Sequence, residues 1–420
     1  MGECLIMNQP INSPVNRPAV KKLSFRENFD LPLLIIVICL FAIGLMMVYS
    51  ASWQFARYQG YSEYETVLRQ VVIGAIGIIG MVVITFIDYH RYKRFIVLGM
   101  LVIMALLAAT LIFGSSDASS PKRGLFSGSV QPSEFAKLMV IIYLSFWLHS
   151  KGESINKFSF GLIPIAAIVG STAGLILAQP DVSAAATVVL LGGILFYIAG
   201  GKLTQILLVV GISAILGILI VKISSTASTR VMDYWNGLQN PEQASDHVKW
   251  SLEAIINGGI FGVGIGRSTT KFIGLPVAST DSIFSVIAEE TGLLGAFIVL
   301  GLYIALIWRG LTIAFRAKDD LGKWLASGIT IWIALEAAIN TGVLVNLLPF
   351  AGNALPFISS GGSSLVTVFA GVGLLFGIAR QSKLDPQPVS ERSIPHAVVD
   401  LRRGDRRGRV SRSVRPTSSR

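Results

Sequence analysis

The chain has 420 residues, of which 52% are hydrophobic and only 14% are charged. Soluble domains carry roughly 25% charged residues, so this composition excludes a soluble globular enzyme. The two cysteines, Cys4 and Cys39, are too few and too badly placed for a disulfide-stapled secreted protein. More than half of the net charge of +11 lies at the C-terminal end, because residues 383–420 hold ten Lys or Arg and four Asp or Glu.

Apolar segments long enough to cross a bilayer recur along the chain. A hydrocarbon core of about 30 Å needs about 20 apolar residues per helix. The sequence contains ten such segments, near residues 31–50, 68–87, 95–113, 134–149, 159–178, 182–200, 204–222, 282–308, 325–348 and 364–380. We therefore predict an all-α polytopic membrane protein with ten transmembrane helices and a large extracytoplasmic loop, residues 223–281, between helices seven and eight.

The basic residues of the short loops predict the orientation, since cytoplasmic loops carry an excess of Lys and Arg. One side of the predicted membrane holds Arg17, Lys21, Lys22, Arg26, Arg91, Lys93, Arg94, Lys151, Lys157, Lys202, Arg309, Arg316, Lys318 and Lys323. Both termini fall on this side and are predicted to be cytoplasmic. The outer face then receives the 223–281 loop and three motif-like stretches near 114–133, 179–181 and 349–364, so chemistry is expected there.

These predictions divide the chain into three parts, anchored in the plasma membrane. Residues 1–30 form a cytoplasmic N-terminal tail, residues 31–380 form the membrane domain, and residues 381–420 form an Arg-rich cytoplasmic tail. The last segment has too little apolar content to fold alone and is predicted to be disordered. We interpret its arginines as fixing topology and contacting anionic lipids in preference to nucleic acid.

Charged side chains inside the predicted spans are the informative positions, because they normally face a protein interior or a water-filled cavity. Glu134 and Lys137 are three residues apart at the start of the fourth span and share one helix face. They are interpreted either as cavity residues or as a structural ion pair. Asp181 follows the helix breaker Pro180, and capping of the sixth helix is as compatible with the sequence as a functional role.

The eighth and ninth spans carry further polar residues. Asp281 ends the long outer loop and opens the eighth span, either as a helix cap or as an acid at the mouth of a cavity. Glu289 and Glu290 lie roughly 12 Å deeper by helical rise. Glu336 and Asn340, four residues apart in the ninth span, form one more polar face. We predict that these last four residues are structural or line a cavity.

Two glycine-rich stretches invite a phosphate-binding interpretation. Residues 258–266 lack the Lys-Ser/Thr of a P-loop and the GxGxxG spacing, so we predict a close-packed or re-entrant backbone there. Gly361, Gly362, Ser363 and Ser364 directly precede the tenth span. Free N–H groups and a positive dipole end at such a helix start suit a phosphate. A tight turn with an N-cap is the alternative.

Several segments together resemble one family, the SEDS proteins (FtsW/RodA/SpoVE-like). The matching motifs are GLMMVYSAS (Gly44 to Ser52), QPSEFAK (Gln131 to Lys137), QPD (Gln179 to Asp181), a GG-rich segment followed by LP and TD (Leu275 to Asp281), AEE (Ala288 to Glu290) and LLPFAGNALPFISSGGSS (Leu347 to Ser364). The resemblance covers about residues 31–380. The MVYSAS ending and the GGSSL segment are more similar to the cell-division branch, FtsW, than to the elongation branch.

The resemblance implies a peptidoglycan glycosyltransferase that polymerises lipid II outside the cytoplasmic membrane, in septal wall synthesis. It implies a class B penicillin-binding protein and other division or elongation proteins as partners. It also implies that Asp281 is the catalytic acid residue and that Glu134, Lys137 and Asp181 are cavity residues.

A chemical hypothesis follows for this reaction. Asp281 would take the proton of the attacking sugar hydroxyl as general base, and the leaving pyrophosphate would need positive charge or N–H donors. The candidate donors are Arg123, Arg267, Lys271, Gly361, Gly362, Ser363 and Ser364.

A divalent cation, Mg²⁺ or Mn²⁺, bridging Asp281 and the pyrophosphate is compatible with this chemistry. No His or Cys cluster in the sequence supports a dedicated metal site, so no metal ligands are predicted. Two other classes of function stay open, a flippase or transporter of a lipid-linked precursor and a non-catalytic scaffold for division. The clustering of polar groups at the outer face favours the enzyme.

Overall fold

The computed structural model describes residues 29–58, 64–114, 124–125, 130–156, 161–276 and 278–384, most of which are helical. Each of the ten apolar segments coincides with a helix. These helices are α2 (Leu31–Tyr58), α3 (Glu65–Phe86), α4 (Ile96–Phe113), α5 (Pro132–Lys151), α6 (Leu162–Ala178), α7 (Val182–Ile198), α8 (Leu203–Ile223), α12 (Ile283–Phe315), α13 (Asp320–Leu344) and α14 (Gly362–Leu384). An isolated antiparallel bridge pairs Leu125 with Val130.

Several of these helices begin where local sequence signals place them. Pro132 occupies the first turn of α5, where its missing N–H costs nothing. The side chains of Asp181 and Asp319 accept hydrogen bonds from main-chain N–H groups in the first turns of α7 and α13. Within α12, Gly292 takes a positive φ of 70° and kinks the helix.

The helices identify a multi-pass membrane protein. Among the described residues, 7 helices are long and apolar enough to cross a membrane: α2, α3, α4, α8, α12, α13 and α14. The helices α6 and α7 are apolar but shorter, with 17 residues each. The 20 residues of α5 include the charged pair Glu134 and Lys137.

The segment predicted as one long loop, residues 223–281, is largely helical, which corrects that part of the prediction. It contains α9 (Ser225–Gln239), the 3-10 helix η3 (Pro241–Gln243), α10 (Asp246–Gly258) and α11 (Thr270–Ile273). These helices are short or amphipathic, so a search for 20-residue apolar runs does not find them. Two further 3-10 helices are η1 (Tyr89–Arg94) and η2 (Gly152–Asn156).

Residues 258–266 form the predicted close-packed backbone. A methyl group added to Gly258 would lie 2.1 Å from the carbonyl oxygen of Ala288 in α12. The carbonyl groups of Gly259 and Ile260 accept hydrogen bonds from the two residues that follow the kink of α12. The glycines therefore allow two backbones to touch.

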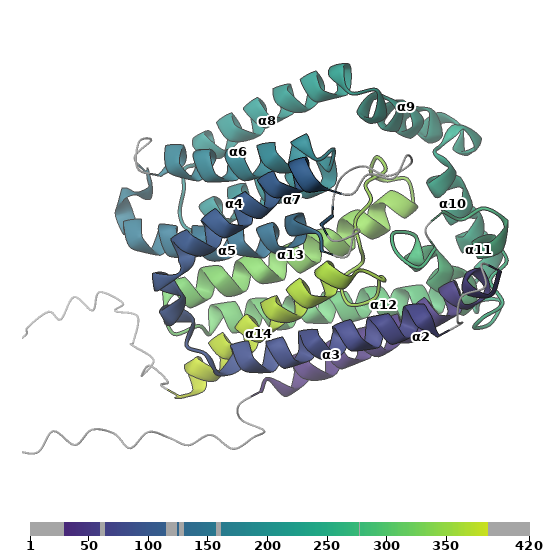
Figure 1. The fold of residues 1–420 in the computed structure, drawn as a ribbon, viewed down its shortest axis with the longest axis horizontal. Helices are drawn as coiled ribbons and strands as arrows, with labels where there is room; N and C mark the ends of the chain where they lie inside the picture. The colour runs from purple at the N-terminus through teal and green to yellow at the C-terminus, as the bar shows by residue number, and fades with distance from the viewer. Residues whose placement is uncertain are drawn as a thin grey trace, which may run out of the picture. The chain divides into compact units, whose positions relative to one another are not determined.

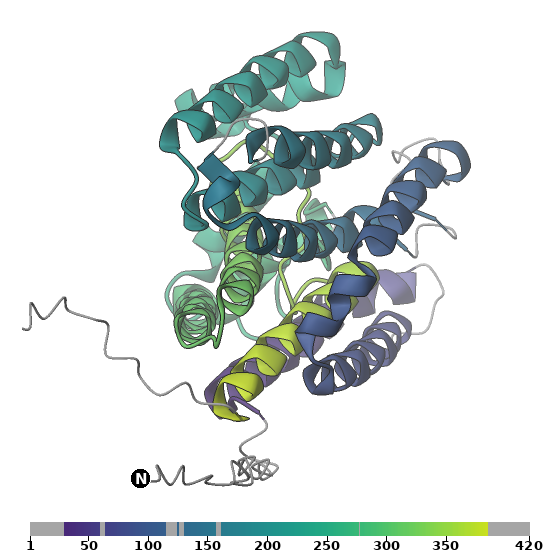
Figure 2. The same ribbon diagram turned by 90° about the vertical axis from the view of Figure 1, so that its left-hand side faces the viewer.

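The central helices of the membrane domain are α13 and α14, which have the largest buried shares among the candidate spans. Figure 1 shows α14 beside α3, and these two helices make an extensive contact. α12 packs on α13, α10 and α2, whereas α8 contacts only α7 and α9 appreciably and buries none of its apolar window. In Figure 2, α8 lies at the edge of the bundle, away from α2 and α3. A residue on α8 is therefore poorly placed to share a site with residues of the other helices.

Helix ends that are far apart in sequence meet at one end of the bundle. The C-terminal end of α2 and the N-terminal ends of α3, α5, α7 and α14 all supply residues to one cavity, described below. At the other end of α2, the carboxylate of Asp30 binds the guanidinium of Arg309 near the C-terminal end of α12, with 2.6 Å between Oδ2 and Nη2. The alternating chain directions thus bring the predicted outer segments together.

Candidate active site

The cavity at this end has a volume of about 1080 Å³. Ligand pockets for small molecules usually have about 300 to 1,000 Å³, so the cavity is large enough for a ligand of that class. Its walls come from α2, α3, α5 and α7, from the segment around α11 up to Asp281, and from the residues around the start of α14. Of the residues predicted for the site, Glu134, Asp181, Lys271, Asp281, Gly361, Gly362, Ser363 and Ser364 line this cavity.

Asp281 lies in the turn before α12 and is half-buried at the cavity wall. The N-cap position of α12 belongs to Ser282, and the helix begins at Ile283. Asp281 is therefore not the helix cap, and of the two sequence interpretations the cavity position is correct. Its main-chain oxygen accepts a hydrogen bond of 2.9 Å from Nδ2 of Asn340 in α13.

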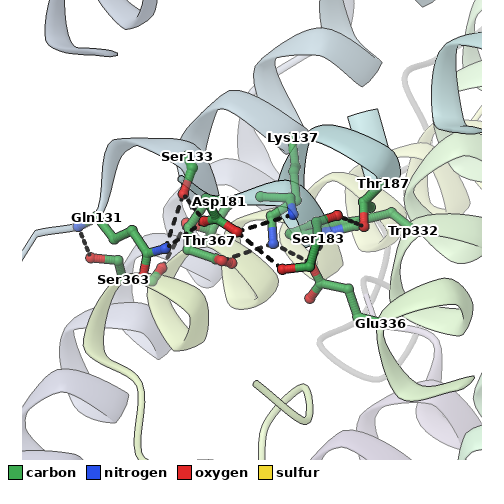
Figure 3. A network of polar contacts seen from close by, with 12 residues as sticks. Gln131, Ser133, Lys137, Asp181, Ser183, Thr187, Trp332, Glu336, Ser363 and Thr367 are labelled. Atoms are coloured by element: carbon green, nitrogen blue, oxygen red, sulfur yellow. Dashed lines mark hydrogen bonds and ion pairs between the residues drawn. The ribbon is translucent and has the colours of Figure 1, made fainter. Parts of the chain in front are cut away.

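Another part of the cavity wall is a polar junction between α5, α7 and α14 (Figure 3). Asp181 caps α7, accepting from the main-chain N–H of Ala184 at 3.2 Å. Its other carboxylate oxygen accepts from Nε2 of Gln131 at 3.2 Å and from the hydroxyl of Ser133 at 3.4 Å. Asp181 thus fulfils the capping interpretation and also lines the cavity.

Next to this junction, Lys137, Glu134 and Glu336 form a buried ion-pair cluster. Nζ of Lys137 is 2.8 Å from Oε1 of Glu134 and also binds the carboxylate of Glu336 in α13. Nε1 of Trp332 donates to Glu336 at 2.8 Å. Glu134 is at the cavity wall, whereas Lys137 is not among the lining residues. The predicted ion pair is confirmed, and the ammonium of Lys137 is paired with two carboxylates.

The start of α14 completes this side of the cavity. The hydroxyl of Ser363 accepts a hydrogen bond from the main-chain N–H of Gln131 at 2.9 Å, which ties the ends of α14 and α5 together. The first N–H groups of a helix have no acceptor within the helix. Because Gly361 to Ser364 line the cavity, the positive end of the α14 dipole lies at the cavity wall.

The predicted basic residues are placed less favourably for binding an anion. Lys271 lies at the cavity wall, but its ammonium is 2.7 Å from the carboxylate of Glu290. Arg267 is exposed and is not among the residues that line the cavity. Arg123 lies outside the described residues. The structure therefore does not bring Arg267 to the cavity, contrary to the sequence hypothesis.

Glu289 and Glu290 hold the segment that leads to Asp281. The carboxylate of Glu289 accepts from the hydroxyls of Ser268 and Thr270 and from the main-chain N–H of Thr269 at 3.0 Å. Both glutamates are fully buried, and neither lines the cavity. These contacts favour the structural one of their two interpretations.

Sequence reasoning missed the contribution of α3. Glu65, Arg69 and Gln70, in the first turns of this helix, line the cavity. Nε2 of Gln70 donates to the main-chain oxygen of Ser359 at 3.1 Å. The available signal was Arg69 itself, a charged residue at the start of an otherwise apolar segment.

The helix α10 supports the turn before α12. The imidazole of His247 stacks on Phe350 with ring centres 4.2 Å apart, and its Nδ1 is 3.5 Å from the hydroxyl of Ser282. Burial, with a smaller contribution from the charge of Arg230, lowers the pKa of His247. His247 is therefore neutral near pH 7 and acts as a packing residue beside the site.

Comparison with known proteins places this geometry in a family. Residues 31–384 match the profile of the FtsW/RodA/SpoVE family, described as cell cycle proteins. The chain belongs to the FtsW/RodA/SpoVE family. It is 35% identical over 359 residues to stage V sporulation protein E of Bacillus subtilis, a match that covers 84% of this chain and 98% of that protein. It is 34% identical over 361 residues to the probable peptidoglycan glycosyltransferase FtsW of Geobacter sp. strain M18, covering 85% and 98%.

Solved structures show that this FtsW/RodA/SpoVE chain shares its fold with other members. The rod shape determining protein RodA of Thermus thermophilus superposes with a TM-score of 0.62 at 24% identity, covering 84% of this chain and 97% of RodA. A chain of a peptidoglycan synthase complex superposes with a TM-score of 0.67 at 23% identity, covering 84% and 98%. The predicted resemblance is confirmed, and the relatives place the chain among the enzymes of peptidoglycan synthesis.

Proposed function

We propose that this chain polymerises lipid II into glycan strands at the outer face of the cytoplasmic membrane. The observation that carries the proposal is one cavity that holds a carboxylate, Asp281, together with the first turn of α14. Glycosyl transfer from a pyrophosphate needs both parts, a base for the attacking hydroxyl and donors for the leaving group.

The reaction assigns a task to each part of the cavity. The sugar 4-hydroxyl of one substrate attacks the anomeric carbon of the other, a new C–O bond forms, and the bond to the pyrophosphate breaks. Asp281 accepts the hydroxyl proton. The pyrophosphate leaves as an anion, held by the N–H groups at the start of α14 and by Arg69, which replaces Arg267 as our candidate cation.

A divalent cation fits this site only as a bridge between protein and substrate. Within the described residues, no three His, Cys, Asp or Glu side chains gather to hold a metal ion. Asp281 would supply one ligand to Mg²⁺ or Mn²⁺ and the pyrophosphate would supply others. When bound, the cation would add positive charge to the leaving group, and polymerisation would then respond to chelation.

We further propose that all ten helices span the membrane with both termini in the cytoplasm. The loops and helix ends assigned to the outer face by charge are the ones that meet at the cavity. The undecaprenyl chain of lipid II would lie between helices in the bilayer while its head group reaches the cavity. A class B penicillin-binding protein would crosslink the product, and the sequence resemblance to FtsW favours a septal role.

The test is lipid II polymerisation by the purified full chain, with and without its cognate penicillin-binding protein. Glycan strands are expected from the wild type and not from Asp281→Ala or Asp281→Asn, while both variants keep the wild-type melting temperature. Strands from Asp281→Ala would refute the base assignment. No strands from any form, with partner present and lipid II intact, would refute the polymerase and support a flippase or a scaffold.

A further inference from the structure

The turn that carries Asp281 is held by three consecutive main-chain carbonyl groups. The carbonyl of Ser279 accepts from the N–H of Ser360 at 2.9 Å, and that of Thr280 accepts from the hydroxyl of Ser359 at 2.7 Å. The carbonyl of Asp281 accepts from Nδ2 of Asn340 at 2.9 Å. All three donors come from α13 or from the loop that links α13 to α14, so this turn is built on them and not on α12.

Asn340 differs from the other two donors because it stands on a long helix. It is 2% exposed, and its Nδ2 also donates to the main-chain oxygen of Asn353 at 2.6 Å. One turn earlier on the same face, Glu336 is fixed by Lys137 of α5. The carboxamide of Asn340 therefore joins two irregular segments to a helix that is itself anchored in the core.

The second of these segments reaches the carboxylate. Gly352, the neighbour of Asn353, lies so close to Asp281 that an added methyl group would be 2.8 Å from Oδ2. Gly352 and Asn353 both line the cavity. A shift of residues 352–353 would therefore change the space available to the carboxylate, and Asn340 is the side chain that fixes both partners.

We propose that Asn340 is a positioning residue that sets the place of the Asp281 carboxylate through its two main-chain hydrogen bonds. The proposal rests on the proposed function, in which Asp281 is the base. Catalytic groups must be held within about 0.5 Å of their productive position by their supporting residues. The hydrogen bond from Asn340 anchors the main chain of Asp281. The backbone at Gly352 packs against Oδ2 of the same residue. Together these two contacts meet the requirement.

The experiment compares steady-state polymerisation of lipid II by Asn340→Ala, Gly352→Ala and a matched control, Thr341→Val. Thr341 is the next residue on α13, and its hydroxyl donates to the carbonyls of Ala337 and Ala338 in the same helix. We expect Asn340→Ala to lower kcat by about 10- to 100-fold, because displacing a catalytic group by about 1 Å has an effect of this size. The KM for lipid II should change by less than about threefold, because Asn340 is not among the residues that line the cavity.

A purely structural role would not produce this pattern. The acid limb of the kcat–pH profile should move in Asn340→Ala and stay in place in Thr341→Val, because only the former alters the surroundings of Asp281. Gly352→Ala should also lower kcat, and it leaves the donors of Asn340 intact. It therefore tests the packing of residue 352 against Oδ2 by itself, also if Asn340→Ala fails to fold.

The outcomes separate the inference from the proposed function. Wild-type kcat in Asn340→Ala, with Asp281→Ala inactive, would overturn the positioning role and leave the base in place. Wild-type kcat in Gly352→Ala would overturn the role of residues 352–353 in limiting the space of the carboxylate. Full activity in Asp281→Ala would overturn the base itself. A low kcat in both test variants, with wild-type melting temperatures and an inactive Asp281→Ala, is the result expected here.

Discussion

The ammonium of Lys271 lies 2.7 Å from the carboxylate of Glu290, and neither side chain is exposed. Lys271 also donates to the main-chain oxygen of Ser50 at 2.9 Å, and the hydroxyl of Ser50 donates to Glu290 at 2.6 Å. The pair thus joins the C-terminal part of α2 to α11 and α12. Lys271 also lines the cavity. An experiment must therefore distinguish a structural role of Lys271 from a role in binding the substrate.

Lys271→Met should destabilise the protein by about 3 to 5 kcal/mol, because it leaves Glu290 as a buried charge without its partner. Adding Glu290→Gln should recover most of this loss. Melting temperature in detergent and lipid II polymerisation should both be measured. Recovery of both in the double variant would identify Lys271 as structural, whereas recovery of stability alone would assign it to the pyrophosphate. A wild-type melting temperature in Lys271→Met would contradict the ion pair.

The ion-pair cluster around Lys137 predicts which of two substitutions destabilises the protein more. Lys137→Met leaves two buried carboxylates, Glu134 and Glu336, without a cation, and should cost at least about 3 to 5 kcal/mol. Glu336→Gln keeps an acceptor for Trp332 and leaves Lys137 paired with Glu134, so it should cost less. Melting temperatures of the two variants check this order, and equal losses would argue against it.

The contact between α10 and α12 predicts a steric effect at Gly258. A methyl group there would meet the main chain of α12, which cannot yield as a side chain can, so Gly258→Ala should destabilise by about 1 to 3 kcal/mol or more. Gly301 in α12 has nothing within 4 Å of an added methyl group and serves as the matched control. Gly301→Ala should raise stability by about 0.5 to 1 kcal/mol. Comparable melting temperatures of the two variants would rule out the predicted clash.

At the other end of the bundle, His90 predicts a pH dependence. Its Nδ1 and Nε2 lie 2.7 Å from carboxylate oxygens of Asp88 and Asp319. Burial acts to lower the pKa of His90, but the two carboxylates outweigh it and raise this pKa above its ordinary value. The stabilisation from the charged imidazole is therefore fully present below the unfolded pKa of about 6.5. It is lost as the pH rises through the raised pKa.

The measurement compares melting temperatures of the wild type and His90→Gln between pH 5 and 9, a range set by the unfolded pKa of about 6.5. The wild type should exceed the variant most at the acid end, and the difference should shrink as the pH rises. The pKa values of Asp88 and Asp319 are lowered, so the stabilisation from these carboxylates is lost only at a pH below this range. A difference that stays constant with pH would show that the charge of His90 does not contribute.

The sequence by itself located the ten apolar helices, because a long apolar run has few other stable conformations in a bilayer. It also marked Glu134, Asp181 and Asp281 as residues that need an explanation, since charged groups in such segments are costly. The order of its motifs led to the family before any geometry was known. The two polar tails stay predictions, since residues 1–28 and 385–420 lie outside the described part of the chain.

Only the tertiary structure decided which of these residues meet. The partners that fix the site, such as Asn340 with Asp281 and Lys271 with Glu290, come from different segments of the chain, and their pairing depends on how the helices pack. The same packing leaves Arg267 outside the cavity and places Arg69 in its wall. From a single sequence one can recognise a charged residue in an apolar segment and expect that it needs a partner. Which residue becomes that partner depends on long-range packing, and this leaves no local pattern in the chain.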